Sequence, residues 1–143
     1  MISPTTLQGY AETTYAILVP DGEPVGLRLH EHSPEADALL DSLGADTLCC
    51  LTAWNPCSRR YPATRNMAAH QRLRRDLARR GWPALPHLGV PDQRGWRAEP
   101  GFAIPGITKE KATGLAETYG QFGIVFYERG GVAELILTRR ALR

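Results

Sequence analysis

The sequence lacks several features that would at once assign it to a class of protein. It has only three cysteines, a formal net charge of +2, and no apolar run close to the roughly 20 residues of a membrane-spanning helix. A charge this small gives no global attraction to nucleic acid or to a membrane surface. The first residues combine neither a basic region nor an apolar core, so no secretory signal peptide is predicted. We therefore expect a soluble cytoplasmic protein.

The cysteines lack the spacing of a disulfide framework or of a zinc site. Cys49 and Cys50 are adjacent in a predicted strand, so their side chains point to opposite faces and do not pair easily with each other. Together with Cys57 they are typical of a reducing cytosol. His30 and His32 place two imidazoles close together, but no third ligand is evident, so no metal site is predicted.

The composition indicates one folded domain over residues 1–143. Hydrophobic residues make up 43% of the chain and charged residues 22%, and no repeat, low-complexity tract or linker interrupts it. Residues 1–14 are expected to form a flexible arm or a short helix. The remainder predicts an α+β fold, with a mixed, mostly antiparallel sheet of about six strands and about three helices. The helices are expected over residues 34–43, 66–80 and 108–119.

Three predicted strand regions matter most for the argument. Residues 15–30 contain two β-prone runs around a Pro-Asp-Gly turn and predict a hairpin. The uncharged run 48–54 predicts a fully buried strand, which ends at an Asn-Pro pair. Residues 82–90 contain prolines that cannot donate to a ladder on both sides, so they predict an edge strand.

The predicted helix 66–80 is amphipathic. Successive helical residues are about 100° apart, which divides this helix into two faces. The face predicted to be buried comprises Asn66, His70, Leu73 and Leu77. The opposite face comprises Arg65, Arg72, Arg75 and Arg79. The polar pair on the buried face lies at the end nearest to the loop that follows the buried strand.

Three separated motifs follow one another along the chain. They are Thr52-Ala-Trp-Asn-Pro56 with Ser58 and Asn66, then Trp96-Arg-Ala-Glu-Pro-Gly-Phe102, then Tyr119-Gly-Gln121 followed by Ile124. In this order they resemble a bacterial family known only as domain of unknown function family 3293, over about residues 15 to 137. Gly101 and Tyr119 stand where the family pattern often has serine and phenylalanine. The resemblance implies no activity. It marks as motif positions Thr52, Trp54, Asn55, Pro56, Ser58, Asn66, Glu99, Pro100 and Gln121.

The polar motif residues flank the ends of predicted strands and helices. If their loops converge, they form a pocket of amides, one hydroxyl and one carboxylate, beside two tryptophans. The candidate ligand-binding residues are Asn55, Ser58, Asn66, Gln121, Trp54 and Trp96. Amides with aromatic walls suit a small, planar, hydrogen-bonding ligand such as a nucleotide. Glu99 is the candidate catalytic acid or base.

Each of these residues also has a purely structural interpretation. Asn55 can bond its own backbone in a turn, and Asn66 can cap the following helix. Glu99 can pair with an arginine such as Arg97. Gln121 can bond the backbone of the loop after the buried strand, and the two tryptophans can belong to the core.

Two further hypotheses come from other classes of function. The first is phosphate or nucleic-acid binding by the basic set Arg59, Arg60, Arg65, Arg72, Arg75 and Arg79, for which a merely solvated helix face is the alternative. The second is a protein-interaction module whose contact surface is the sheet edge near residues 82–90. No Walker loop, G-x-G-x-x-G or G-x-S-x-G motif is present, so no cofactor and no reaction are predicted.

Overall fold

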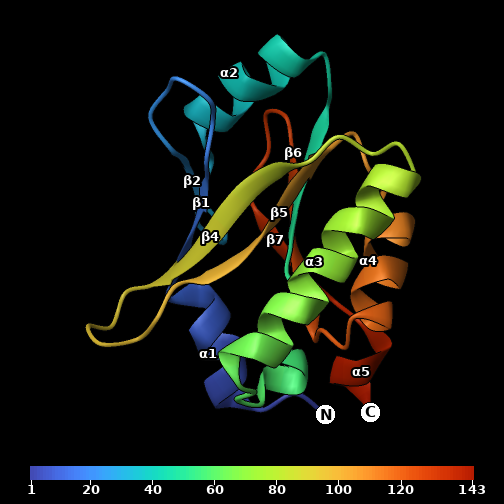
Figure 1. The fold of residues 1–143 in the computed structure, drawn as a ribbon. Helices are drawn as coiled ribbons and strands as arrows, with labels where there is room; N and C mark the ends of the chain where they lie inside the picture. The colour runs from blue at the N-terminus through green and yellow to red at the C-terminus, as the bar shows by residue number, and fades with distance from the viewer.

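A seven-stranded antiparallel sheet is the frame of the structure, a computed structural model that describes residues 1–143 (Figure 1). Its strand order is β2-β1-β4-β5-β3-β6-β7, and every neighbouring pair is antiparallel. In chain order the elements are α1 (Pro4–Ala11), β1 (Thr13–Ile17), β2 (Val25–Leu27), α2 (Pro34–Leu43), β3 (Thr47–Leu51), a 3₁₀ turn (Pro56–Ser58), α3 (Ala63–Arg79), β4 (Leu85–Pro91), β5 (Glu99–Pro105), α4 (Lys109–Thr118), β6 (Gly123–Glu128), β7 (Glu134–Leu137) and α5 (Arg139–Leu142).

The two edges of the sheet meet at one end. Leu29, which follows β2, forms a parallel bridge with Ala133, which precedes β7. The N–H of His30 donates to the Ala133 carbonyl at 2.8 Å, and the N–H of Ala133 donates to the Glu31 carbonyl at 3.1 Å. Because β2 and β7 are the outermost strands, this bridge curls the sheet into an incompletely closed barrel. α2 covers one end of it, and α1 lies at the other end (Figure 1).

The curved sheet separates two hydrophobic clusters. The inner cluster lies between the concave face and α2, and includes Leu27, Leu40 and Cys50. The outer cluster lies between the convex face and the helices α3 and α4, which run side by side in Figure 1. It includes Leu73 and Cys49, so the two adjacent cysteines of β3 point to opposite faces, as strand alternation predicts.

The predicted α+β class, the antiparallel pairing and the three main helices are confirmed. Ser33 caps α2 by accepting the Ala36 N–H at 3.1 Å, and Thr108 caps α4 by accepting the Lys111 N–H at 3.2 Å. The structure has seven strands and five helices, more than the six and three expected. The additional helices are α1, which is the helical alternative expected for residues 1–14, and α5, which is too short for a periodic pattern to reveal. None of the helices is both long and apolar enough to cross a bilayer.

The edge-strand prediction for residues 82–90 is wrong. β4 lies between β1 and β5 in the interior of the sheet. Its ladder with β1 runs from Thr13 opposite Pro91 to Ile17 opposite His87. Pro91 ends this ladder and Pro86 lies just beyond its other end, so the missing N–H groups interrupt no internal bond. The surface expected for an interaction module is therefore not an edge.

Two boundaries also differ from the sequence prediction. β3 ends at Leu51, because the next residue, Thr52, turns its hydroxyl to the Pro100 carbonyl at 2.7 Å and accepts the Trp54 N–H at 3.0 Å. α3 begins at Ala63 rather than at residue 66. Its start has no side-chain cap that a sequence pattern could reveal.

Tyr127 on β6 ties the sheet to the start of α2. Its side chain is fully buried, and its hydroxyl donates to Asp37 Oδ1 at 2.8 Å and accepts the Ser33 N–H at 3.3 Å. Burial and the Asp37 carboxylate raise the pKa of Tyr127 to about 12, so the hydroxyl remains a donor at neutral pH. The contact holds the first turn of α2 against the inner face of the sheet.

We predict that Tyr127→Phe lowers the free energy of unfolding by about 1–3 kcal/mol, because it leaves the buried Ser33 N–H without its acceptor. Chemical denaturation measures the loss. Tyr61→Phe is the control, because no hydrogen bond involves the Tyr61 hydroxyl, and it should change stability by less than about 0.5 kcal/mol. Equal effects of the two variants would contradict the assigned role.

Candidate functional site

The loop between β3 and α3 holds an unusual backbone conformation. Asn55, Cys57 and Ser58 have φ angles of 46°, 55° and 55°, in the left-handed region that residues other than glycine rarely adopt. Each such residue costs of the order of 1 kcal/mol or more, and the conformation persists only where surrounding contacts impose it. Three of them within four positions therefore indicate a loop that is strongly held by its neighbours.

Asn66, on the buried face of α3, is the main contact that holds the loop. Its Oδ1 accepts the Asn55 N–H at 2.9 Å, and its Nδ2 donates to Asn55 Oδ1 at 2.8 Å and to the Tyr61 carbonyl at 3.2 Å. Asn55 Oδ1 also accepts the Tyr61 N–H at 3.1 Å. The alternative that Asn66 caps the helix is wrong, since Asn66 lies inside α3 and bonds back to the loop. Asn55 likewise bonds across the loop rather than to its own backbone.

A second set of contacts holds the loop from the other side, at the end of α4. Gln121 Nε2 donates to the Trp54 carbonyl at 3.1 Å, which is the bond expected if Gln121 serves the backbone of the loop. The Cys57 N–H donates to the Gly120 carbonyl at 2.8 Å. Gly120 has a φ of 72°, and a Cβ there would lie 2.9 Å from Pro56 Cβ. Only glycine lets the two segments approach this closely.

Glu99, the first residue of β5, is held by this loop. Asn55 Nδ2 donates to Glu99 Oε1 at 3.1 Å. Glu99 makes no ion pair with Arg97 or with any arginine of α3, contrary to the structural alternative. Burial raises the pKa of the Glu99 carboxyl above its usual value, and the bond from Asn55 offsets part of this rise. The carboxyl is thus half-buried, held at one oxygen, and without a counter-charge.

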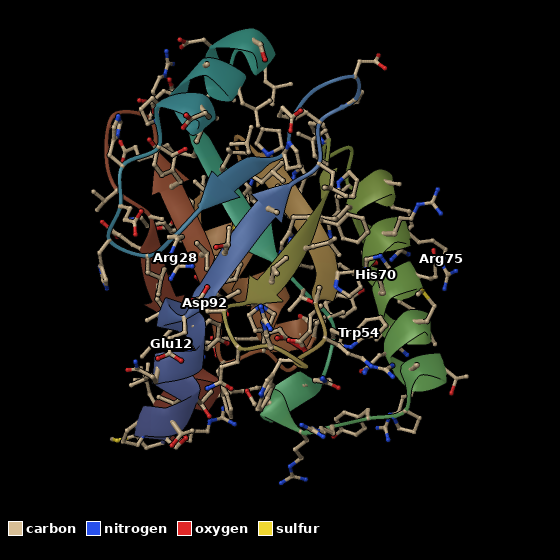
Figure 2. All side chains as sticks on the ribbon, turned by 90° about the vertical axis from the view of Figure 1, so that its left-hand side faces the viewer. Glu12, Arg28, Trp54, His70, Arg75 and Asp92 are labelled. Carbon is tan, nitrogen blue, oxygen red and sulfur yellow. The ribbon has the colours of Figure 1, made fainter.

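The remaining predicted pocket residues are placed differently from one another. Ser58 is exposed and its hydroxyl makes no hydrogen bond, so the structure leaves it outside the cluster. Trp54 is partly buried, and Figure 2 shows it below His70, on the side of α3 that faces the sheet. Trp96 is 58% exposed, so it is not a core residue. Arg60 lies over its ring, with Cζ 5.5 Å from the ring centroid.

Two residues near β5 escaped the sequence analysis. Burial raises the pKa of the Tyr10 hydroxyl on α1, and the Glu99 charge adds to this rise. His87 of β4 is only 4% exposed and lies opposite Gly101, and its Nδ1 has no hydrogen-bond partner. A Cβ at Gly101 would collide with the His87 ring. The glycine at position 101 of the second sequence motif was the one available signal of a close approach.

The basic residues of α3 are exposed on its outer face, whereas Arg60, in the loop before α3, lies over the ring of Trp96, three residues before Glu99. In Figure 2, Arg75 points away from the sheet, whereas His70 on the same helix faces it. The six arginines of the predicted basic set are all exposed: Arg59, Arg60, Arg65, Arg72, Arg75 and Arg79. Three of them, at positions 72, 75 and 79, line a cavity of about 480 Å³ together with Asp76 and Tyr119.

The buried imidazole of His87 predicts a pH dependence of stability. Burial lowers the pKa of His87 from 6.5 to about 4, so below pH 6.5 the unfolded chain takes up a proton that the folded chain does not. The free energy of unfolding should therefore fall by about 2 kcal/mol between pH 7 and pH 5 from this group alone. Urea denaturation at a series of pH values measures the slope. His87→Leu should remove this contribution and leave the part that comes from His70, whose pKa is also lowered by burial.

The matched control is His30→Asn, which removes an exposed imidazole at a position where φ is 68° and asparagine is tolerated. It should leave the pH slope unchanged. If His87→Leu keeps the wild-type slope in this range, His87 is not the titrating group.

Comparison with known protein families places the residues of the candidate site in one matched segment. A family model matches residues 51–124, just over half of the chain, and this segment contains the loop, Asn66, Glu99 and Gln121. It excludes β1, β2 and α2, so it is narrower than the range suggested by the sequence motifs. No curated protein and no solved structure matches the chain. On the family match, the chain belongs to the family described as protein of unknown function (DUF3293).

Proposed function

We propose that this protein binds a small nucleotide-like ligand at Glu99, at the end of the sheet where α1 lies. The observation that supports the proposal is the state of the Glu99 carboxyl. It is partly removed from water and has no cation beside it, yet a strained loop holds it in place through Asn55. A structural carboxylate is usually paired when it is buried, and backbone strain tends to accumulate at functional sites.

The hydrogen-bonding groups left free define what the site offers. Asn66 uses its side-chain oxygen and both N–H groups within the loop, and Gln121 donates to the backbone. Glu99 Oε2 and the second N–H of Asn55 have no protein partner. They present one acceptor and one donor side by side, which is the pattern that a planar amide-like or nucleobase edge satisfies.

Two loops supply the other elements of a nucleotide site: Trp96 comes from the β4–β5 loop and Arg60 from the β3–α3 loop. Trp96 lies three residues before Glu99 and exposes 58% of its surface, so its ring is available for stacking. Arg60 lies over that ring and has no carboxylate partner, so its guanidinium is available to a phosphate. Because its pKa is raised, the Glu99 carboxyl is also the group through which the site would transfer a proton to or from a reacting ligand.

The test titrates the wild-type protein and Glu99→Gln with the four ribonucleoside monophosphates by calorimetry. At least one should bind the wild type, and Glu99→Gln should weaken that binding at least ten-fold, about 1.4 kcal/mol. Stability should not fall, because a buried carboxyl with a raised pKa is destabilising when ionised and glutamine keeps the acceptor for Asn55.

The matched control is Glu23→Gln, the same change at an exposed carboxyl in the β1–β2 turn, which should bind like the wild type. Native mass spectrometry of the purified protein adds a search for a ligand that co-purifies. A large loss of melting temperature in Glu99→Gln would show that Glu99 is structural. Absence of binding by all four nucleotides, with no co-purifying molecule, would overturn the proposal.

A further inference from the structure

We propose that the outer face of α3, together with the groove between α3 and α4, binds single-stranded nucleic acid. Its main part lies on the side of α3 that faces away from the sheet, where Figure 2 shows Arg75, and the loop before α3, with Arg60 and Tyr61, is the part that it shares with the surroundings of Glu99. The proposal rests on three observations: a local excess of positive charge, the absence of carboxylate partners, and aromatic side chains placed along the same surface.

The charge of the chain is strongly segregated. Residues 59–80 contain eight arginines and one acidic residue, a net charge of +7, whereas the whole chain has +2 and the remainder therefore has −5. This segment forms α3 and its two flanks. α3 has 17 residues and is about 25 Å long at 1.5 Å per residue, so the charge extends along a strip rather than around a point. A linear polyanion is the ligand that matches such a strip.

The arginines of the strip are available. Of the eight, only Arg79 has a carboxylate within 4.0 Å, that of Asp76. By contrast, Arg28 and Arg129 on other surfaces each contact two different carboxylates. Unpaired guanidinium groups repel one another, so the strip is a local electrostatic cost that an anionic ligand would relieve.

Aromatic side chains lie along the strip at intervals. Tyr61 lies at the start of α3 beneath Arg65, whose Cζ is 4.3 Å from its ring centroid. Tyr119 lies in the groove with Arg72, Arg75 and Arg79, and its hydroxyl donates to Asp76. Trp82 follows the end of α3 and has Arg80 at 5.4 Å and Lys111 at 5.9 Å from its ring. Each ring is only partly buried.

This combination favours single strands over other polyanions. A positively charged groove with interspersed aromatic side chains is the usual design for binding unpaired bases, which stack on the rings while the backbone follows the charges. A duplex offers no free base faces. An anionic bilayer would require several large apolar side chains between the basic ones, and α3 exposes only Met67 of this kind besides alanine.

The test measures binding of a fluorescent oligothymidylate of about 16 nucleotides by anisotropy at several salt concentrations. The wild type should bind, and Arg72→Gln/Arg75→Gln should reduce the slope of log K against log salt by about 1.4, or about 0.7 for each phosphate that is no longer neutralised. The control Arg139→Gln/Arg143→Gln removes the same charge from α5 and the residue after it, where neither arginine has a carboxylate partner, and should leave the slope unchanged.

A second variant tests the stacking contribution. Tyr61→Leu keeps the net charge and should weaken binding about five-fold or more, while its melting temperature stays close to that of the wild type. Glu99→Gln should bind the oligonucleotide normally, which separates this result from that of the nucleotide proposal. Any one of three results would overturn the inference. The first is an equal reduction of the salt slope in the α5 control. The second is tighter binding to a duplex, unaffected by Tyr61→Leu, and the third is binding to phosphatidylserine vesicles but not to the oligonucleotide.

Discussion

The reciprocal pair of side-chain amides between Asn55 and Asn66 is the interaction on which the candidate site depends. It connects a loop with three left-handed residues to the buried face of α3, and through Asn55 it reaches Glu99 on β5. Because Asn66 is only 2% exposed, water cannot replace these bonds. The end of β3, the start of α3 and the start of β5 are therefore coupled by one small polar network.

The motif residues divide into those that build the site and those that remain available in it. Asn66, Gln121 and Thr52 use their side chains to bond the backbone of neighbouring segments. Glu99 and Trp96 keep unsatisfied or exposed surface. The hydrogen bonds of the first group impose the strained conformation of the loop. The strained loop in turn holds the Glu99 carboxyl of the second group, whose pKa is raised by burial.

α3 has two chemical faces that serve the two proposed surfaces. Its inward face buries Leu73 and Leu77 against the convex side of the sheet and places Asn66 beneath the loop. Its outward face is a strip of arginines with almost no acidic partners. The helix can hold both because burial on one side anchors it firmly, so that the repulsion on the other side does not unfold it.

Much of the local structure follows from the sequence. The helix caps at Ser33 and Thr108, the opposed side chains of Cys49 and Cys50, and the two faces of α3 all arise from spacings of one to four residues. Local geometry determines them, so periodicity and capping preferences suffice. The family motifs likewise selected most of the residues that the structure brings together around the loop.

The remainder was decided only by tertiary structure. β4 is an interior strand because its prolines happen to fall at the ends of the ladder with β1, and a register between distant segments is not visible in either segment alone. Asn66 serves the loop rather than the helix end because Asn55 folds back onto it, and Ser58 is exposed and makes no bond to this network. The sequence by itself determined which residues carry side chains able to hydrogen-bond, ionise or stack. Contacts between segments 11 to 67 residues apart determined which of them meet, since only the packed chain satisfies their buried hydrogen bonds.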